Sequence, residues 1–271
     1  MKLGIDIGST NVKIVLMDNE KIVRKLFFYM EGKKFVNLLD KAINFEITSQ
    51  NSVYITGVGS SYVKNNKKLS SLVDNKKIII VSEIDALSKG ALTLTKLSHA
   101  LVASCGTGTA FIKASNGNAV HIGGSGVGGG TIVGLSTLFG ITDDIEKIKL
   151  YALDGNTNNL DSLIEDITLK STKLLAPNVT ASNFGKVSVN KKYNKCDISS
   201  SILNMVYQTI AMLSVFAARS IKENNVILVG ALSESIYAKK VLKDVEALHE
   251  DINFFIPDDG IYACCMGATI L

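Results

Sequence analysis

Proline, arginine and long hydrophobic runs are scarce in this sequence, and each scarcity excludes a class of protein. Only 2 of the 271 residues are proline, while 46% are hydrophobic, a composition that indicates a folded globular chain and not a disordered one. A chain of this length forms one large domain or two lobes. The basic residues are mostly lysines in short clusters, whereas a nucleic-acid-binding face would be rich in arginine. We therefore expect solvated lysine-rich loops and no nucleic-acid partner.

No run of about 20 apolar residues is present, so no membrane partner is expected. The nearest approach is residues 198–218, which carry no charge but include several serines. We predict a helix there, buried in a core or at a subunit interface. The opening "MKLGIDIG" leads directly into a strand pattern, which predicts a cytoplasmic protein without a secretory signal.

Cysteine is also rare. The four cysteines have no CxxC spacing, and Cys264 and Cys265 are neighbours. Without an export signal, this pattern favours free buried thiols over disulfides or a metal site.

The strand pattern occurs twice along the chain. Residues 3–9 and 12–18 read as strands around a Gly-Ser-Thr-Asn turn, and residues 21–30 as a third strand. The pattern restarts at His99, with strands at 99–105 and 109–115 and a third at 117–124. This recurrence predicts an α/β fold of two related lobes, residues 1–95 and 96–271, with a nucleotide between them.

The other segments predict alternating elements. Strands are expected at 52–60, 78–81, 225–232 and 252–257. Helices are expected at 33–45, from Ser82 onward, largely throughout 130–171, and at 199–223, 235–248 and 262–271.

The first turn, "DIGSTNVK", has the residues of a phosphate site. Gly8 allows close backbone approach, Ser9 and Thr10 supply hydroxyl donors, Lys13 a cation, and Asp6 an acceptor for hydrated Mg²⁺. The alternative is an ordinary hairpin whose glycine and serine serve only turn geometry.

Three later glycine segments extend this pattern. "CGTGTAF" places Thr107 and Thr109 around Gly108, again suited to phosphate oxygens. "VHIGGSGVGGGTIVG" (residues 120–134) ends in a probable helix start, which attracts anions. "LVGALS" (residues 228–233) follows a strand where adenosine-contacting backbone is expected, or it is only a strand-to-helix turn.

A general base is expected in "VSEIDALSKGA". Glu83 follows a buried strand, where site residues commonly emerge from a sheet, and Asp85 is close enough to share the site. The alternative role for this pair is a helix N-terminal cap.

The segments "GIDIGSTNVK", "SEIDAL", "GTGT", "IGGSGVGGGTIVGL" and "ASNFGKV" occur in an order that resembles the type II (eukaryotic-like) pantothenate kinases. This family belongs to the ASKHA superfamily, which also contains sugar kinases and actin, and the resemblance covers the whole chain. It implies two ribonuclease-H-like lobes with nucleotide in the interlobe cleft, commonly in a homodimer. It also implies ATP- and Mg²⁺-dependent phosphorylation of pantothenate, the first step of coenzyme A biosynthesis.

The resemblance implies a role for each matched position. Glu83 would be the catalytic base, and Asp6 would also hold the metal. Nucleotide-binding positions would be Asp6, Gly8, Ser9, Thr10, Asn11, Lys13, Thr107, Gly108, Thr109, Gly129, Gly130, Thr131, Ile132, Val133 and Ala231.

Two positions depart from the family pattern. Ser9 replaces the second glycine of a double glycine, which leaves ATP binding intact. His121 stands where the family has an arginine that hydrogen-bonds pantothenate, and histidine is shorter and mostly uncharged near neutral pH. We expect His121 at the acceptor pocket, or simply packed at a strand end.

Three other functions remain open on these residues. One is a kinase of this fold with another small hydroxyl substrate, which His121 supports. Another is an ATP-hydrolysing activator of 2-hydroxyacyl-CoA dehydratases, whose opening also reads "GIDIGST" but which needs cysteines for an iron–sulfur cluster. The last is an actin-like filament protein.

Overall fold

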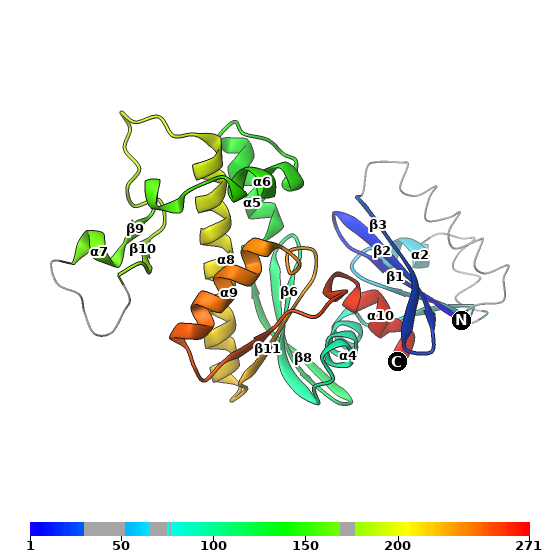
Figure 1. Cartoon of the computed structure of the whole chain (residues 1–271). Coiled ribbons are helices and arrows are strands. Elements are labelled where there is room, and N and C mark those ends of the chain that lie inside the picture. The colour runs from blue at the N-terminus through cyan, green and yellow to red at the C-terminus, as the bar shows by residue number, and fades with distance from the viewer. Residues whose placement is uncertain (30–51, 66–74, 76, 169–176) are drawn as a thin grey trace.

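The structure is a computed structural model that describes residues 1–29, 52–65, 75, 77–168 and 177–271. Two five-stranded sheets lie side by side (Figure 1), one built from the first part of the chain and one from the remainder. The helix predicted at 33–45 lies outside the described residues.

The first sheet has the strand order β3-β2-β1-β4-β5. Its first three strands form an antiparallel meander, and β4 and β5 then pair in parallel. This agrees with the strands predicted for the start of the chain. Its strands and the short helix α2 have these bounds: β1 Lys2–Ile7, β2 Asn11–Asp18, β3 Lys21–Tyr29, β4 Ser52–Thr56, α2 Ser60–Asn65 and β5 Ile78–Ile80.

The second sheet has the order β12-β11-β6-β7-β8 and repeats the plan, with an antiparallel meander followed by parallel strands. The predicted recurrence at His99 is therefore present in the structure. Its strands have these bounds: β6 His99–Cys105, β7 Thr109–Ser115, β8 Asn118–Ser125, β11 Asn225–Val229 and β12 Asn253–Phe255.

Helices cover both faces of the second sheet. The long helix α8 (Lys195–Ser220) and α9 (Ile236–Leu248) pack on one face, while α4 (Glu83–Thr95) and the C-terminal α10 (Ala263–Ile270) lie between the two sheets (Figure 1). Side chains alternate along β6: Leu101 and Ala103 join the α8 core, whereas Ala100 and Val102 join the α4 core.

The remaining helices are short: α5 Gly129–Leu138, α6 Ile145–Leu153 and α7 Ile164–Ile167. A 3₁₀ turn at Thr157–Asn159 and a two-stranded sheet, β9 (Ser162–Leu163) with β10 (Thr180–Ser182), complete this part. A second 3₁₀ turn, Gly260–Tyr262, precedes α10.

The prediction of a largely helical stretch at 130–171 is wrong for residues 154–163, and α-helix returns only in α7. After α6 ends at Leu153, the buried carboxylate of Asp161 accepts hydrogen bonds from the Phe184 backbone N–H (2.9 Å) and from Asn204 Nδ2 (2.9 Å). Asn156 Oδ1 likewise accepts from the Asn158 N–H (3.1 Å). Side chains that bind backbone N–H groups compete with helix formation, so this segment forms turns.

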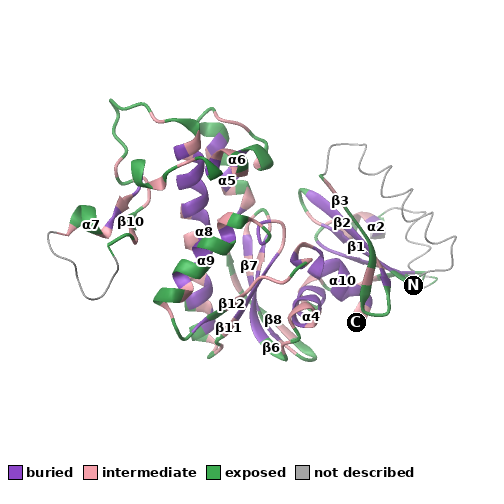
Figure 2. Cartoon of the chain, in the orientation of Figure 1, coloured by how far each residue is buried: buried purple, intermediate pink, exposed green. Residues whose placement is uncertain are grey.

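Helix α8 is long and apolar enough to cross a membrane by length and composition, with a mean hydropathy of 1.5 in its most apolar window, of which 61% is buried inside the structure. Its side chains supply much of the larger core, including Ile202, Leu203 and Val206, as predicted for residues 198–218. Figure 2 shows that much of α8 is buried.

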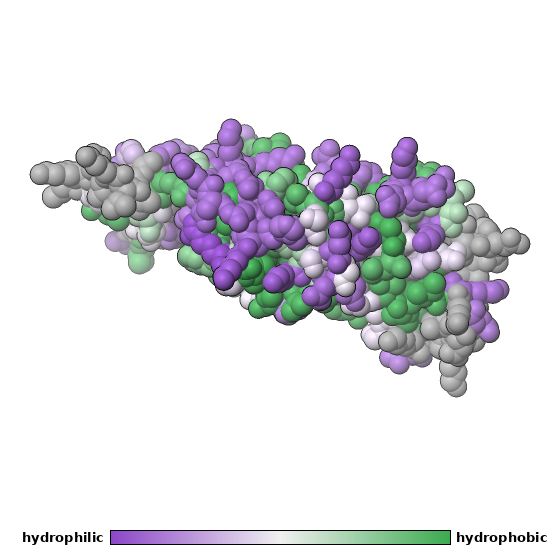
Figure 3. Space-filling view, turned by 90° about the horizontal axis from the view of Figure 1, so that it is seen from below, coloured by the Kyte–Doolittle hydropathy of each residue, from purple (hydrophilic) through white to green (hydrophobic). Residues whose placement is uncertain are grey.

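On the face of the molecule seen in Figure 3, hydrophilic side chains surround smaller hydrophobic areas.

Candidate active site

The β1–β2 turn carries the first group of predicted site residues. Asp6 and Lys13 are register partners on the two strands, and both are buried. Their side chains form an ion pair, with Lys13 Nζ 3.0 Å from Asp6 Oδ2. Ser9 and Thr10 are exposed at the tip of the turn, where a ligand can reach their hydroxyls.

The β6–β7 turn packs against the start of α5. A Cβ on Gly128 would lie 2.6 Å from the carbonyl oxygen of Thr107, so this close approach requires glycine. The N–H groups of Gly129 and Gly130 donate to the carbonyl oxygens of Gly106 and Thr107, each at 2.9 Å. These two donors at the helix start are therefore engaged within the protein, contrary to the expectation that they face an anion.

The two turns meet across the cleft. Thr107 Oγ1 lies 3.0 Å from Ser9 Oγ and 3.4 Å from Thr10 Oγ1. Three hydroxyl groups from turns about a hundred residues apart thus converge on one point, where they can donate to the oxygens of a phosphate.

A cavity of about 360 Å³ lies beside this point. It is lined by Asp6, Gly8, Ser9, Thr10, Asn11, Lys13, Val58, Glu83, Leu87, Ser104, Gly106, Thr107, Gly108, Thr109, Ala110, Ser125, Gly230, Ala231, Gly260, Ile261 and Cys264. The acidic residues in this set, Asp6 and Glu83, both lie at the carboxyl ends of strands of the first sheet: Asp6 is near the end of β1, and Glu83 begins α4 just after β5.

Glu83 reaches the cavity because β5 ends just before it. The cap of α4 is Ser82, whose hydroxyl accepts the Asp85 N–H at 3.4 Å, so neither carboxylate caps the helix. Burial and the neighbouring Asp6 carboxylate raise the pKa of Glu83, and Lys13 partly opposes this shift. A carboxylate with a raised pKa is a better proton acceptor, which suits a general base.

The pKa values of two other buried groups of this cavity, Lys13 and Cys264, are also shifted by their surroundings. Burial disfavours the Lys13 ammonium, but the Asp6 carboxylate outweighs burial and the pKa of Lys13 is raised. Burial, together with Asp6 and Glu83, raises the pKa of the Cys264 thiol well above its usual range. Lys13 is therefore a cation at neutral pH and Cys264 a neutral thiol.

A larger cavity of about 1230 Å³ adjoins the first. The cavities share Thr10, Asn11, Gly106, Thr107, Ala231 and Ile261, so the convergence point of the hydroxyls is the passage between them. The larger cavity is further lined by Phe27, Tyr29, Gly129, Gly130, Val133, Gly134, Asp143, Asp144, Ile145, Glu146, Lys149, Leu150, Leu153, Leu232, Glu234, Ser235, Ile236 and Tyr237.

Most of the predicted site residues line one of these cavities. The exceptions are Asp85, His121, Thr131 and Ile132. Asp85 and His121 are exposed. His121 lies on the outer strand β8, opposite Ile112 of β7. Thr131 bonds back to its own loop, with Oγ1 3.1 Å from the Gly126 carbonyl oxygen, and Ile132 is fully buried in the core.

Several lining residues were not predicted. Ile261 and Cys264 arrive from the C-terminal turn and α10, and Phe27 and Tyr29 from the end of β3. No local pattern marks Ile261 and Cys264, because they reach the cleft only through the packing of α10 between the sheets. Gly230, by contrast, stands in the "LVGALS" turn and was recognisable there.

The residues present fit a magnesium nucleotide. Asn11 Oδ1 is buried without a hydrogen-bond partner and belongs to a residue that lines both cavities. Asn11 and Asp6 both line the smaller cavity, and their oxygens are of the kind that hydrated Mg²⁺ prefers. Within the described residues, no group of three or more His, Cys, Asp or Glu side chains forms a protein-only metal site.

Two sheets that meet at a cleft with a glycine-rich hydroxyl turn from each side define an ASKHA-type, two-lobed α/β fold. The chain is similar to component A of the (R)-2-hydroxyglutaryl-CoA dehydratase from Acidaminococcus fermentans, with a TM-score of 0.62 and 17% identity over 98% of this chain and 95% of that chain. A glucokinase of the ROK family from Streptomyces griseus, solved with glucose and AMPPNP, gives a TM-score of 0.60 at 11% identity over 98% and 97% of the two chains.

The sequence comparison is more specific. Residues 2–256 match the model of the Fumble family, and the chain belongs to that family. A type II pantothenate kinase from Bacillus thuringiensis is 28% identical over 267 residues, covering 95% of this chain and 93% of the relative. One from Staphylococcus epidermidis is 26% identical over 281 residues, covering 100% of each chain.

Proposed function

We propose that this protein is a kinase that transfers the γ-phosphoryl group of ATP to the primary hydroxyl of pantothenate, giving 4'-phosphopantothenate for coenzyme A biosynthesis. The relatives named type II pantothenate kinase support the substrate, since they match nearly the full length of this chain. The two adjoining cavities support the reaction type. The larger cavity has room for a nucleotide, and the smaller one, which Glu83 lines, has room for a small acceptor beside the phosphates.

Each group in the smaller cavity has a role in this transfer. The Glu83 carboxylate accepts the proton of the acceptor hydroxyl as its oxygen attacks the γ-phosphorus, and ADP leaves. The hydroxyls of Ser9, Thr10 and Thr107 bind phosphate oxygens, and Lys13 supplies positive charge while holding Asp6. Most of the barrier reduction in phosphoryl transfer comes from such positioning and charge neutralisation.

Magnesium, when bound, would neutralise phosphate charge and fix the geometry of the nucleotide. Asp6 and Asn11 are the residues that would hold its hydrated form, because their oxygens lie at the passage between the cavities or next to it.

The observation that carries this proposal is the position of Glu83, half-buried in the cavity that also holds the Asp6–Lys13 pair. The test is ADP release from Mg-ATP with and without pantothenate, with the product identified by mass. Pantothenate should stimulate turnover strongly. Glu83→Gln should lower kcat by about 10²–10⁴-fold, the usual contribution of a general base.

Glu250→Gln is the matched control, because Glu250 is exposed and outside both cavities. It should retain wild-type turnover. ATP binding without stimulation by pantothenate would remove pantothenate as the acceptor. Bound iron with acceptor-independent hydrolysis would indicate an activator ATPase, and nucleotide-dependent polymerisation would indicate a filament protein.

A second candidate acceptor is another small hydroxyl compound. His121 favours it, because this side chain replaces the family arginine and is exposed, outside both cavities. A screen of hydroxyl acceptors with wild type and His121→Arg tests this alternative. If an arginine at position 121 contacts the acceptor, the variant should have the lower KM for pantothenate, whereas an equal KM would agree with the place of His121 outside both cavities.

We also propose that the protein is cytoplasmic and forms a homodimer. Each chain would have two lobes, residues 1–95 and 96–271. Leu138 and Phe139, at the end of α5, are 83% and 51% exposed and are candidates for the dimer contact. Sedimentation of wild type and Leu138→Asp tests this point.

A further inference from the structure

The turn Gly230–Ser233, between β11 and α9, lies against both cavities. Gly230 and Ala231 line the smaller cavity, and Ala231 and Leu232 line the larger one. Gly230 has φ +97°, and a Cβ there would lie 2.6 Å from the Cys105 carbonyl oxygen. Gly230 thus has a backbone conformation that favours glycine, and the turn packs directly against the end of β6, where the β6–β7 turn begins.

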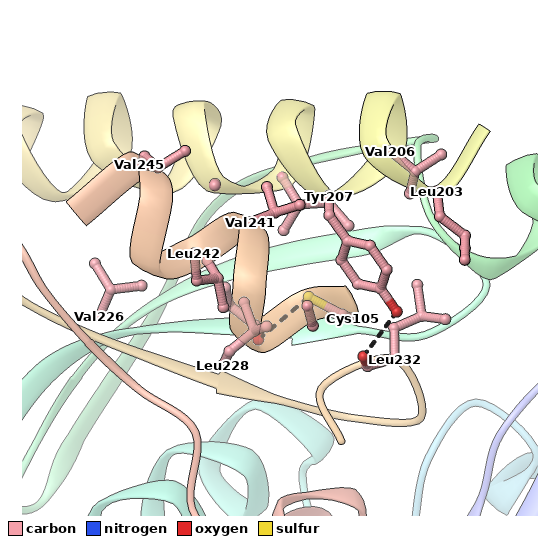
Figure 4. Close-up of a cluster of buried hydrophobic side chains, with 14 of the residues drawn as sticks. Cys105, Leu203, Val206, Tyr207, Val226, Leu228, Leu232, Val241, Leu242 and Val245 are labelled. Carbon is pink, nitrogen blue, oxygen red and sulfur yellow. Dashed lines mark hydrogen bonds between the residues drawn. The ribbon is translucent and has the colours of Figure 1, made fainter. Parts of the chain in front are cut away.

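Hydrogen bonds fix this turn from two elements. The Leu232 N–H donates to the Cys105 carbonyl oxygen (3.2 Å), next to the Gly106–Thr107 turn. From α8, the Tyr207 hydroxyl donates to the Leu232 carbonyl oxygen at 3.0 Å, in a fully buried position (Figure 4). The N–H group of Leu232 is therefore bound by the end of β6, and its carbonyl oxygen is bound by α8.

Tyr207 does not itself line either cavity. It is 1% exposed and packs among apolar side chains of α8 and α9 (Figure 4). Burial raises the pKa of its hydroxyl, which therefore remains a protonated donor over the physiological range. Any effect of Tyr207 on a bound nucleotide must act through the Leu232 backbone that it holds or through the side chain of Ser235, which its hydroxyl also contacts.

A second tyrosine hydroxyl makes a similar connection. Tyr237, at the start of α9, lines the larger cavity, and its hydroxyl is hydrogen-bonded to Ser200 on α8. Ser200 is 1% exposed and lines neither cavity. The cleft-lining segment 230–237 is thus attached to α8 at both ends.

We infer that Tyr207 is a positioning residue for nucleotide binding: its hydrogen bond to Leu232 holds the Gly230–Ser233 turn in the shape that receives the nucleotide. The inference rests on the proposed ATP-dependent function and adds a residue outside the cavities to it. The Tyr237–Ser200 bond acts in the same way on the other end of the segment.

The test compares Tyr207→Phe with Tyr193→Phe. Tyr193 is the matched control, because its hydroxyl also donates to a backbone carbonyl oxygen (Lys186, 3.1 Å) but the residue lines neither cavity. Calorimetry with the non-hydrolysable analogue AMPPNP gives Kd without any acceptor. Loss of one buried hydrogen bond should raise the Kd of Tyr207→Phe about fivefold, and leave that of Tyr193→Phe unchanged.

Kinetics separates positioning from general destabilisation. In Tyr207→Phe the KM for ATP should rise in parallel with Kd, while kcat at saturating ATP and the KM for pantothenate stay at wild-type values. A purely structural role would lower the Tm of both tyrosine variants and leave these constants alone, which would overturn the inference. If Tyr207→Phe does not fold, Ser200→Ala provides the second test, with a raised Kd expected and an unchanged Kd contradicting the inference.

The outcome for wild type distinguishes this inference from the proposed function. Wild type that binds AMPPNP, together with an unchanged Kd in the folded variants, overturns only the role of Tyr207. Wild type that does not bind AMPPNP overturns both. Binding without pantothenate-dependent turnover overturns the proposed acceptor and leaves the positioning result standing.

Discussion

At the scale of single residues, Glu83 has the property that a general base needs. Its pKa is raised by burial and by Asp6, so the carboxyl takes up its proton at a higher pH than an ordinary glutamate does. Because the base must be ionised to accept a proton, kcat/KM should fall as pH is lowered through this raised pKa. A pH profile of pantothenate-dependent turnover checks this, and an acid limb at or below the ordinary value of about 4.3 would contradict it.

The same raised pKa predicts a change in stability with a defined sign. The folded state holds the Glu83 proton more tightly than the unfolded state, so the free energy of unfolding decreases as pH rises from the unfolded pKa through the folded one. Glu83→Gln should therefore have a higher Tm than wild type at pH 7. The difference should shrink as pH falls through the folded pKa, and it should be lost below the unfolded value of about 4.3, where the glutamate is protonated in both states. Equal Tm values across this pH range would indicate that Glu83 is well solvated.

The cleft was predictable at this scale only where its residues are local in sequence. Asp6, Ser9 and Thr10 stand in one turn, and Glu83 follows a buried strand, so their grouping follows from strand and turn patterns. Cys264 lines the same cavity but comes from the far end of the chain. Its place depends on long-range packing, which no short pattern encodes.

At the scale of elements, the position of Glu83 depends on how closely α4 and α10 cross. A Cβ on Gly90 would lie 1.8 Å from the Ala263 carbonyl oxygen, so Gly90→Ala must push α10 away from α4. Overpacking of this kind should lower the free energy of unfolding by about 1–3 kcal/mol. Because Glu83 begins α4, kcat should fall as well. Urea unfolding and steady-state kinetics measure the two effects.

Gly134→Ala is the matched control for stability. Gly134 lies within α5, and a Cβ there would meet no atom within 4 Å. Alanine is the better helix former, so this variant should be more stable than wild type by about 0.5–1 kcal/mol. Stability losses of similar size in both variants would show that the α4–α10 contact has no special importance.

The elements themselves were predicted unequally well. The two meanders follow from alternating apolar residues and glycine turns, which are local signals, and both are present. Residues 154–163 lie in a stretch predicted as largely helical and are not α-helical, because Asp161 and Asp197 bind backbone N–H groups of loops. Asp197 lies 41 residues from its partner Asn156, so that contact has no local signal.

At the scale of the whole molecule, the cleft lies between two sheets that touch through Ser9, Thr10 and Thr107. A nucleotide whose phosphates bind both turns would connect the two sheets. It should then stabilise the entire fold, by about 2.7 kcal/mol at a ligand concentration of 100 Kd. Thermal unfolding with AMPPNP should show this as a rise in Tm.

Hydrogen exchange locates the connection, because amides that a ligand orders exchange more slowly. AMPPNP should slow exchange in the β1–β2 turn and the β6–β7 turn together, although these turns are about a hundred residues apart. Thr107→Val removes the hydroxyl that lies between Ser9 and Thr10 and keeps the side-chain shape, so it should weaken protection at both turns. Thr168→Val is the control, because its hydroxyl bonds within α7, outside both cavities. Protection confined to one turn would mean that the nucleotide binds to one sheet alone, and that the contact between the turns has no part in its recognition.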